Sequence, residues 1–388
     1  MNRVIWIVLD SVGCGEAPDA DKFGDVGSNT IRSAAAAVEG FDLPNMRKIG
    51  YGNIDGIEGV EPVDEPIGAY GKCSEKSMGK DTTLGHWEMA GIITPNPLPT
   101  YPDGFPDEVM EAFMKEAGVG GYYCNKPYSG TKVIYDYWDE HMKTGYPIIY
   151  TSGDSVFQIA AHEDVIPVER LYELCRAARK ILTGQHAVGR VIARPFIGTR
   201  DDFTRTSNRR DFSLVPSDDN ILMYLKNAGH NVAAVGKIED IFAGSGITSA
   251  THTKNNMDGM DVTFKYMKEI DEGLIYTNLV EFDSTFGHRR DAVGYANGLL
   301  DFDRRLGELF ELMTDDDLLV ITADHGCDPS FKGTDHTREY VPVLMYRHGM
   351  KGVNLGVSDT FADIAQTISD MFGLKKFPVG KSYLDLLK

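Results

Sequence analysis

The fold class of this 388-residue chain follows from Leu318-Leu319-Val320-Ile321-Thr322-Ala323-Asp324-His325-Gly326. The apolar residues 318–321 contain no turn residue, which predicts a strand buried on both faces of a parallel sheet. Asp324 and His325 follow where that strand should end, and Gly326 allows a sharp exit. Ligands of open α/β sheets bind outside the carboxyl ends of the strands. The carboxylate and imidazole therefore suggest a metal site, although an ordinary polar turn also explains this motif alone.

Two further apolar runs end in the same way. Residues 4–9 precede Asp10, and residues 274–282 precede Asp283, with His288 five residues later. Asp10 alone could cap a turn through backbone amides. Three strands that each bring a carboxylate to one sheet edge are better explained by two divalent ions sharing a bridging group. The candidate ligands are Asp10, Asp283, His288, Asp324, His325 and His336. Such oxygen-rich sites with imidazole suit Mn²⁺, and the ligand types also admit Zn²⁺ or Mg²⁺.

Size and composition limit the class of protein. A chain of 388 residues exceeds one usual compact core, so two domains are expected. The net charge of −19 argues against non-specific nucleic-acid binding and requires local positive charge or metal for an anionic substrate. Five cysteines without paired spacing fit a reducing cytosol. No signal peptide or membrane span is expected, so the sequence predicts a cytoplasmic protein.

The predicted metal-binding strands lie on both sides of a segment with its own character. A proline-rich break at residues 94–102 opens this segment, which has its own predicted helices and strands. It is therefore expected to be an inserted α/β cap, residues 95–213. The discontinuous core would comprise residues 1–94 and 214–388, with a mostly parallel sheet between helices. Arginines gather near residues 190–210 of the cap; they match phosphate oxygens well, but a solvated surface explains them equally.

One loop combines glycine, lysine and hydroxyl residues before a helix expected near Trp87. It runs Gly79-Lys80-Asp81-Thr82-Thr83. Free amides at a helix start favour phosphate binding, and a hydroxyl beside metal ions could be a nucleophile. Serine, threonine and aspartate are also ordinary residues at helix starts. From these residues alone, the capping role is favoured.

Four motifs together resemble the bacterial phosphopentomutases of the alkaline phosphatase superfamily. They are Asp10-Ser11-Val12-Gly13, residues 79–88, residues 283–291, and residues 323–326 with 333–339. The resemblance runs in order from the first strand past Pro342 and includes the cap. Residues 283–291 and 333–339 are specific, whereas residues 323–326 alone would indicate only the superfamily. The resemblance implies an alkaline-phosphatase-like core with a smaller inserted cap.

The resemblance also implies roles for individual residues. One Mn²⁺ would be held by Asp10, Asp324 and His325. The other would be held by Asp283, His288 and His336. Thr82 would carry the phosphoryl group and bridge both ions, with the adjacent Thr83 as the alternative. The residues implied for the sugar-phosphate pocket are Ser152, Asp154, Val156, Arg190, Ile192 and Arg205 from the cap, and Lys237 from the core.

The implied activity interconverts ribose 1-phosphate and ribose 5-phosphate, and their 2-deoxyribose equivalents. It would proceed through phosphothreonine and a pentose 1,5-bisphosphate, linking nucleoside breakdown to pentose metabolism. Phosphorylation of the enzyme at the outset would need a sugar bisphosphate, either glucose 1,6-bisphosphate or ribose 1,5-bisphosphate. The protein is expected to be a monomer. A related metal-dependent phosphatase or phosphoglycerate mutase is the alternative enzyme. The third hypothesis is a protein that binds divalent cations without catalysis. The Thr82 loop and the cap arginines argue against it, because cation binding alone would not need them.

Overall fold

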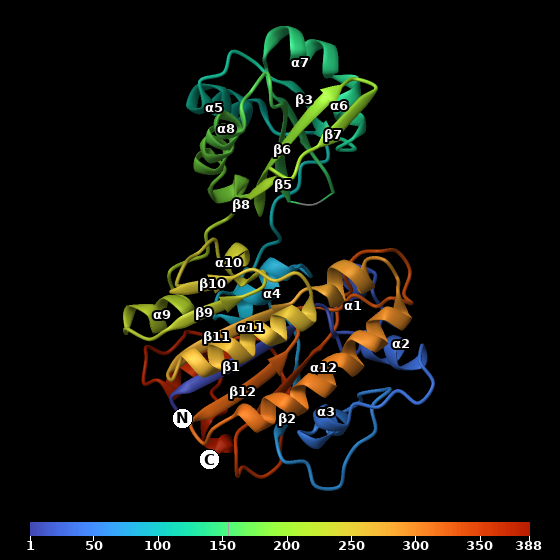
Figure 1. Cartoon of the computed structure of the whole chain (residues 1–388), viewed down its shortest axis with the longest axis vertical. Helices are drawn as coiled ribbons and strands as arrows, with labels where there is room; N and C mark the ends of the chain where they lie inside the picture. Colours follow the sequence, from blue (N-terminus) through green and yellow to red (C-terminus); the bar gives the residue numbers. More distant parts are fainter. Residues whose placement is uncertain (154) are drawn as a thin grey trace. The chain divides into compact units, whose positions relative to one another are not determined.

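A computed structural model describes residues 1–153 and 155–388 and divides the chain into two compact units (Figure 1). The core unit comprises Met1–Asn96 and Pro216–Lys388, and the inserted unit comprises Pro97–Val215. The sequence placed these boundaries after residues 94 and 213. No helix in the described part of the chain is both long and apolar enough to cross a membrane.

An eight-stranded sheet forms the centre of the core unit. In spatial order its strands are β10 (Ser249–Thr251), β9 (Val232–Val235), β11 (Gly273–Leu279), β1 (Arg3–Leu9), β12 (Asp317–Thr322), β13 (Val341–Tyr346), β2 (Ala69–Cys73) and β14 (Val353–Ser358). β13 runs antiparallel to its neighbours, and the other pairs are parallel. The three strands predicted to carry metal ligands are therefore adjacent, with their carboxyl ends at one edge of the sheet.

Helices cover both faces of this sheet, as two consecutive residues of β11 show. The Thr277 hydroxyl lies 2.7 Å from that of Thr263 in α11 (Asn256–Glu269), whereas the Tyr276 ring contacts Phe242. Successive strand residues point to opposite faces. The α11 side also carries α12 (Ala292–Leu312), visible in front of the sheet in Figure 1. The opposite layer holds α4 (Thr82–Met89), α9 (Ile221–Asn227), α10 (Ile238–Ile241) and α13 (Asp363–Met371). Burial on both sides explains the unbroken apolar sequence of the central strands.

Shorter elements complete the core unit. The helices α1 (Ala20–Phe23), α2 (Thr30–Ala36) and α3 (Pro44–Lys48) precede β2, and the 3-10 turns are Tyr51–Asn53 and Leu384–Leu387. Asn29 caps α2 by accepting a hydrogen bond from the amide of Arg32 at 3.1 Å. The residues Ser28-Asn29-Thr30 are of the types that helix starts prefer.

Three predicted element ends were wrong. The helix expected near Trp87 begins earlier, at Thr82, because Asp81 caps it. The residues Pro216-Ser217 also predict a helix start, but that helix begins at Ile221, where the Asn220 side chain accepts from the amide of Met223 at 3.0 Å. The third difference concerns Asp283, which does not end a strand. β11 stops at Leu279, and Asp283 lies in a π-helical turn, Phe282–Gly287, whose apolar residues continue the strand-like pattern of the sequence.

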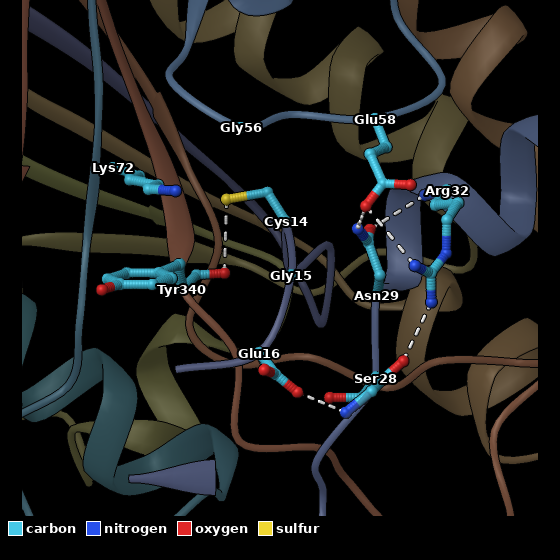
Figure 2. Close-up of a pocket in the computed structure, with 11 residues that line it drawn as sticks. Cys14, Gly15, Glu16, Ser28, Asn29, Arg32, Gly56, Glu58, Lys72 and Tyr340 are labelled. Atoms are coloured by element: carbon cyan, nitrogen blue, oxygen red, sulfur yellow. Dashed lines mark hydrogen bonds and ion pairs between the residues drawn. The ribbon is translucent and has the colours of Figure 1, made fainter. Parts of the chain in front are cut away.

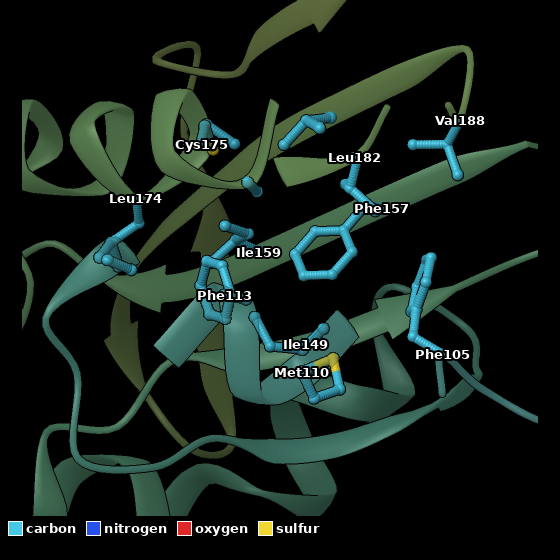
Figure 3. Packing of buried hydrophobic residues seen from close by; sticks show 14 of the residues in the cluster. Phe105, Met110, Phe113, Ile149, Phe157, Ile159, Leu174, Cys175, Leu182 and Val188 are labelled. Carbon is cyan, nitrogen blue, oxygen red and sulfur yellow. The ribbon is translucent and has the colours of Figure 1, made fainter. Parts of the chain in front are cut away.

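The inserted unit contains a six-stranded sheet. Its strands run in the order β3 (Tyr123–Pro127), β4 (Ile148–Thr151), β5 (Val156–His162), β6 (Arg190–Thr199) and β7 (Asp202–Arg205), with β8 (Arg210–Ser213) also paired to β6. Phe113 and Leu174 of α5 (Asp107–Ala117) and α8 (Val168–Ile181) pack with Phe157 on one face (Figure 3). On the other face, part of the sheet packs against α6 (Lys132–Asp136) and α7 (Trp138–Thr144). A 3-10 turn, Gly184–His186, follows α8.

Candidate metal centre

All six predicted metal ligands gather at the carboxyl ends of β11, β1 and β12. Two groups of side chains have donor atoms within 4.8 Å of one another: Asp10 with Asp324 and His325, and Asp283 with His325 and His336. A third group joins Asp283 and His288 to Cys327. The parallel arrangement of three adjacent strands therefore brings together residues that are more than 300 positions apart in sequence, as Asp10 and Asp324 are.

The two halves of this cluster share one space. His325 Nε2 lies 3.4 Å from Asp10 Oδ1 and 3.4 Å from Asp324 Oδ2. In the other half, His336 Nε2 lies 3.2 Å from Asp283 Oδ1 and 3.0 Å from His288 Nε2. The rings of His325 and His336 stack at 3.9 Å between centroids, which joins the halves.

Each of the three histidines has its ring orientation fixed by a backbone carbonyl. Nδ1 lies 2.6 Å from Thr334 O in His288, 3.0 Å from Gly326 O in His325, and 2.7 Å from Lys80 O in His336. A carbonyl oxygen only accepts, so each Nδ1 carries the proton and donates. In a neutral ring, each Nε2 then presents its lone pair to the cluster, the arrangement typical of histidines that bind metal.

One oxygen of each aspartate has no hydrogen-bond partner among the described residues. These buried atoms are Asp10 Oδ1, Asp283 Oδ1 and Asp324 Oδ2. The other oxygen of Asp10 accepts from Asn278 Nδ2 at 3.0 Å, and that of Asp324 accepts from the Ser11 amide at 2.9 Å. An unpaired buried carboxylate oxygen is costly, and a bound cation removes that cost. The donor set therefore fits divalent metal ions.

The charges of the cluster shift the pKa values of several of its own side chains. Burial and repulsion from Asp324 raise the pKa of Asp10. Burial would also raise the pKa of Asp283, but His336 and the other histidines outweigh it and lower that pKa to about 2. Burial opposes a proton on His325, yet the nearby Asp324 carboxylate raises its pKa well above the usual value. Three closely packed carboxylates therefore create a strong demand for positive charge at this site.

Thr82 lies beside the cluster as the first residue of α4. Its Oγ1 is 3.2 Å from His325 Nε2. The amides of Thr83 and Leu84 donate to the Asp81 carboxylate at 3.0 and 3.2 Å, so they serve as the helix cap and not as a phosphate cradle. Gly85 allows this close approach of the helix, because a Cβ there would lie 2.2 Å from Asp324 O.

Two residues that contact this cluster were missed in the sequence. His86 is fully buried, and its Nδ1 lies 2.8 Å from Thr82 O and 3.2 Å from Asp324 Oδ2. Asn278 Nδ2 lies 3.3 Å from His86 Nε2 and also holds Asp10. The position of His86, four residues after Thr82 on one helix face, was a usable signal. Nothing local distinguished Asn278 within its apolar strand.

A buried arginine connects the loop before Thr82 to the loop that carries His336. Arg338 donates to Asp19 Oδ1 at 3.0 Å, to Glu75 Oε2 at 2.6 Å and to the carbonyl of Gly79. Lys80 Nζ forms a parallel connection to Asp25 Oδ2 at 3.0 Å. Two charged contacts therefore hold the loop that precedes Thr82: Arg338 binds the carbonyl of Gly79, and Lys80 binds Asp25.

Comparison with known proteins places this site in a family. The Metalloenzyme superfamily model matches residues 2–376. A phosphopentomutase of Acetivibrio thermocellus is 56% identical over 385 residues, covering 99% of each chain. A phosphopentomutase of Clostridium novyi is 57% identical over 388 residues, covering 99% of this chain and 98% of the relative. The chain belongs to the phosphopentomutase family.

A solved structure shares this fold. The PH0037 protein from Pyrococcus horikoshii matches with a TM-score of 0.50 at 14% identity, covering 97% of this chain and 99% of that one. The predicted resemblance to phosphopentomutases is confirmed, and so is the predicted fold class, an alkaline-phosphatase-like α/β core with an inserted α/β cap.

The phosphopentomutase resemblance also assigned residues to a substrate pocket. Val156 and Arg190 pair across β5 and β6, and Ile192 follows on the same face of the sheet. Arg190 Nη1 lies 3.5 Å from Asp211 Oδ2, and the exposed Arg205 ends β7. Ser152 is partly buried after β4. Asp154 lies outside the described residues.

The seventh pocket residue, Lys237, belongs to the core unit, where it is exposed in the turn between β9 and α10. The inserted sheet also carries polar residues that the sequence analysis missed. Arg194 follows Ile192 on the same face of β6, and its Nε donates to Gln158 Oε1 at 3.0 Å. The Tyr150 hydroxyl is buried and has no hydrogen-bond partner among the described residues.

The core unit of this phosphopentomutase-family chain also contains a cavity of about 300 Å³ (Figure 2). Its charged groups are satisfied locally: Arg32 Nη1 lies 3.4 Å from Glu58 Oε1, and Lys72 Nζ lies 2.6 Å from Asp55 O. Cys14 and Tyr340 form part of the wall, and the described lining includes none of the six candidate metal ligands. The cavity therefore adds nothing to the metal centre.

Proposed function

We propose that this chain interconverts ribose 1-phosphate and ribose 5-phosphate, and the 2-deoxyribose equivalents. The observation that carries the proposal is the position of Thr82, whose hydroxyl oxygen lies 3.2 Å from His325 Nε2 at the edge of the aspartate and histidine cluster. Near-complete alignment with phosphopentomutases supports the choice of sugar phosphates as substrates. The activity would connect nucleoside breakdown to pentose metabolism.

The cluster would hold two divalent ions, proposed to be Mn²⁺. Asp10, Asp324 and His325 would bind one, and Asp283, His288 and His336 would bind the other. When bound, such ions neutralise phosphoryl oxygens and stabilise an alkoxide at a hydroxyl that is otherwise a weak nucleophile. The unpaired oxygens of the three aspartates and the fixed Nε2 atoms of the histidines support this assignment.

Thr82 would carry the phosphoryl group between the two positions of the sugar. In the first half, the bond from phosphorus to Thr82 Oγ1 breaks as a sugar hydroxyl oxygen bonds to phosphorus, giving a pentose 1,5-bisphosphate. In the second half, the bond from phosphorus to the sugar oxygen at the other position breaks as Thr82 Oγ1 bonds to that phosphorus. The released sugar oxygen takes up a proton, which balances the proton lost from the sugar hydroxyl in the first half. His86 supports this role because it binds the Thr82 carbonyl and so fixes the start of α4. A sugar bisphosphate, glucose 1,6-bisphosphate or ribose 1,5-bisphosphate, would prime Thr82.

The inserted unit would recognise the sugar phosphate. Arg190 and Arg205 would bind the phosphate that does not react, since a guanidinium pairs well with phosphate oxygens. The proposed contacts to the sugar come from Ser152, Asp154, Val156 and Ile192, together with Lys237 of the core unit. A mutase must also protect phospho-Thr82 from water in order to transfer the phosphoryl group rather than hydrolyse it.

Mass measurement of the phosphorylated residue tests this proposal. The Mn²⁺-loaded protein is incubated with ribose 1,5-bisphosphate and digested, and a single phosphate is expected on Thr82. Thr82→Ala should remove the adduct and the isomerase activity, whereas the matched control Thr83→Ala should keep both. Near-normal turnover in Thr82→Ala would reject the phosphoenzyme. Turnover of 3-phosphoglycerate in place of ribose 5-phosphate would identify the alternative mutase.

A further inference from the structure

Cys327 lies against the half of the metal centre that contains Asp283 and His288. Its sulfur and one donor atom of each of those residues lie within 4.8 Å of one another. The side chain is only 1% exposed. Of the cysteines in the described chain, Cys327 alone belongs to a group of potential metal ligands.

The backbone holds this sulfur in place. The Cys327 amide lies 3.1 Å from Ser11 O and 3.1 Å from Thr30 Oγ1, so the turn after β1 and the first residue of α2 fix it. Gly287 closes the other side, because a Cβ there would lie 2.8 Å from the sulfur. The absence of a side chain at Gly287 lets the thiol approach the π-helical turn that carries Asp283.

A second feature points to a ligand beside the same residues. Asp283 Oδ1 is buried and has no hydrogen-bond partner among the described residues, and it lies 3.4 Å from His288 Nε2 and 3.2 Å from His336 Nε2. Among the described residues, the hydrogen bond that the thiol donates is a long one, 3.8 Å to Asp335 O. Oxygen, nitrogen and sulfur donors thus surround one position.

We propose that Cys327 is a reserve metal ligand that binds soft divalent cations, such as Cd²⁺ or Zn²⁺, at the position of Asp283 and His288. The inference rests on the proposed metal pair, but it concerns which ions this half of the site retains. Thiolate ligands select soft cations, whereas carboxylate and imidazole suit Mn²⁺. When a soft ion binds, the S–H bond of Cys327 breaks, its proton passes to the buffer, and a sulfur–metal bond forms without redox change. The ion would then be held with a sulfur ligand that Mn²⁺ does not use, and it would displace Mn²⁺ from this position.

Cadmium titration of the full-length protein tests the proposal without relying on turnover. Bound Cd²⁺ is followed by the ultraviolet charge-transfer absorption of a cadmium–thiolate bond. The wild type should show an absorption band that saturates at one equivalent of Cd²⁺ per chain. The matched control Cys124→Ser, which changes a cysteine of the inserted unit, should show the same band. Cys327→Ser should lose the band and bind Cd²⁺ at least about tenfold more weakly, since even the loss of a ligand's hydrogen-bond partner has that effect. Its Mn²⁺ content, measured by elemental analysis, should stay at the wild-type value.

Three results would overturn the proposal. One is a band of unchanged intensity in Cys327→Ser, and another is a Mn²⁺ content that falls together with Cd²⁺ binding, which would make Cys327 structural. The third is a band that persists in Asp283→Asn, because the thiol would then bind cadmium without the site. If the serine variant unfolds, Cys327→Ala removes the sulfur without a buried hydroxyl and is scored in the same way. A protein that shows the expected bands but no isomerase activity would reject the proposed function and leave this inference standing.

Discussion

His336 Nδ1 donates to the carbonyl oxygen of Lys80 across 2.7 Å. Lys80 lies two residues before Thr82, so this bond joins the loop of a candidate metal ligand to the loop of the proposed nucleophile. The same bond directs His336 Nε2 toward Asp283 Oδ1, 3.2 Å away. The position of the threonine and the binding of metal therefore depend on each other.

We expect His336→Ala to lower the occupancy of one metal ion far more than the other. The variant removes a donor from the half that contains Asp283 and His288, while Asp10, Asp324 and His325 remain. Elemental analysis of the Mn²⁺-loaded variant should fall from about two ions per chain toward one, because loss of a direct ligand weakens binding by at least about tenfold. His348→Ala, a partly exposed histidine outside the cluster, is the control. Two tightly held ions in His336→Ala would contradict the assignment.

Arg338 provides a test of the loop before Thr82. Its guanidinium pairs with Glu75 at 2.6 Å, and both side chains are 2% exposed. Arg338→Met should lower the free energy of unfolding by about 3–5 kcal/mol, because it leaves a buried carboxylate unpaired. Urea denaturation measures this loss.

The matched control for Arg338 is the double variant Arg338→Met with Glu75→Gln. It should recover part of the lost stability because the unpaired charge is gone. Equal stability of the single and double variants would contradict the explanation that the unpaired Glu75 charge causes the loss.

The sequence predicted the central strands and the ligands at their ends for a physical reason. Strands buried on both faces are continuous apolar runs, and a polar residue stands out where each run stops, as Asp10 and Asp324 do. The same pattern failed at Asp283, because the apolar Phe282 continues the run into a π-helical turn. The capping role favoured for residues 79–83 is confirmed at Asp81, but the start of α4 was placed too late because the helix begins directly after this cap.

The residues that support the ligands were not predictable in this way. Asn278 and Asp10 are 268 positions apart, and Arg338 and Glu75 are 263 apart. Their pairing depends on packing between distant segments, which no local pattern records. The partial exception is His86, since its spacing from Thr82 within one helix could have been used.

For the inserted unit we expect Arg190→Ala and Arg205→Ala each to reduce kcat/KM for ribose 5-phosphate. A charge-assisted hydrogen bond to phosphate is worth about 1.5–3 kcal/mol, which corresponds to roughly 10- to 150-fold. Phosphorylation of Thr82 by a small bisphosphate donor should suffer less if that donor relies mainly on the metals. Arg200→Ala is the matched control, because Arg200 is also on the inserted unit but pairs with Asp139 at 2.6 Å. Normal turnover of ribose 5-phosphate by both variants would reject this role.

The last prediction concerns the pH dependence of the inserted unit. His141 is buried there, with Nδ1 2.7 Å from Tyr146 O and Nε2 2.9 Å from the amide nitrogen of His162. Nδ1 must donate to the carbonyl and Nε2 must accept from the amide, so the neutral ring satisfies both bonds. Burial lowers the pKa of His141 below the ordinary value of 6.5, despite its bond to the Tyr146 carbonyl.

The sign of the effect follows from which state binds more protons. Below pH 6.5 the unfolded chain protonates His141 before the folded chain does. The contribution of His141 to the free energy of unfolding should therefore be fully present above that pH. It should decline by up to about 1.4 kcal/mol per pH unit as the pH falls toward the folded-state pKa. Hydrogen exchange of β5, which contains His162, reports this change at pH 7.5, 6.5 and 5.5. His141→Gln should lose part of the slope because the titrating group is gone, and an unchanged slope in that variant would assign the pH dependence to other groups.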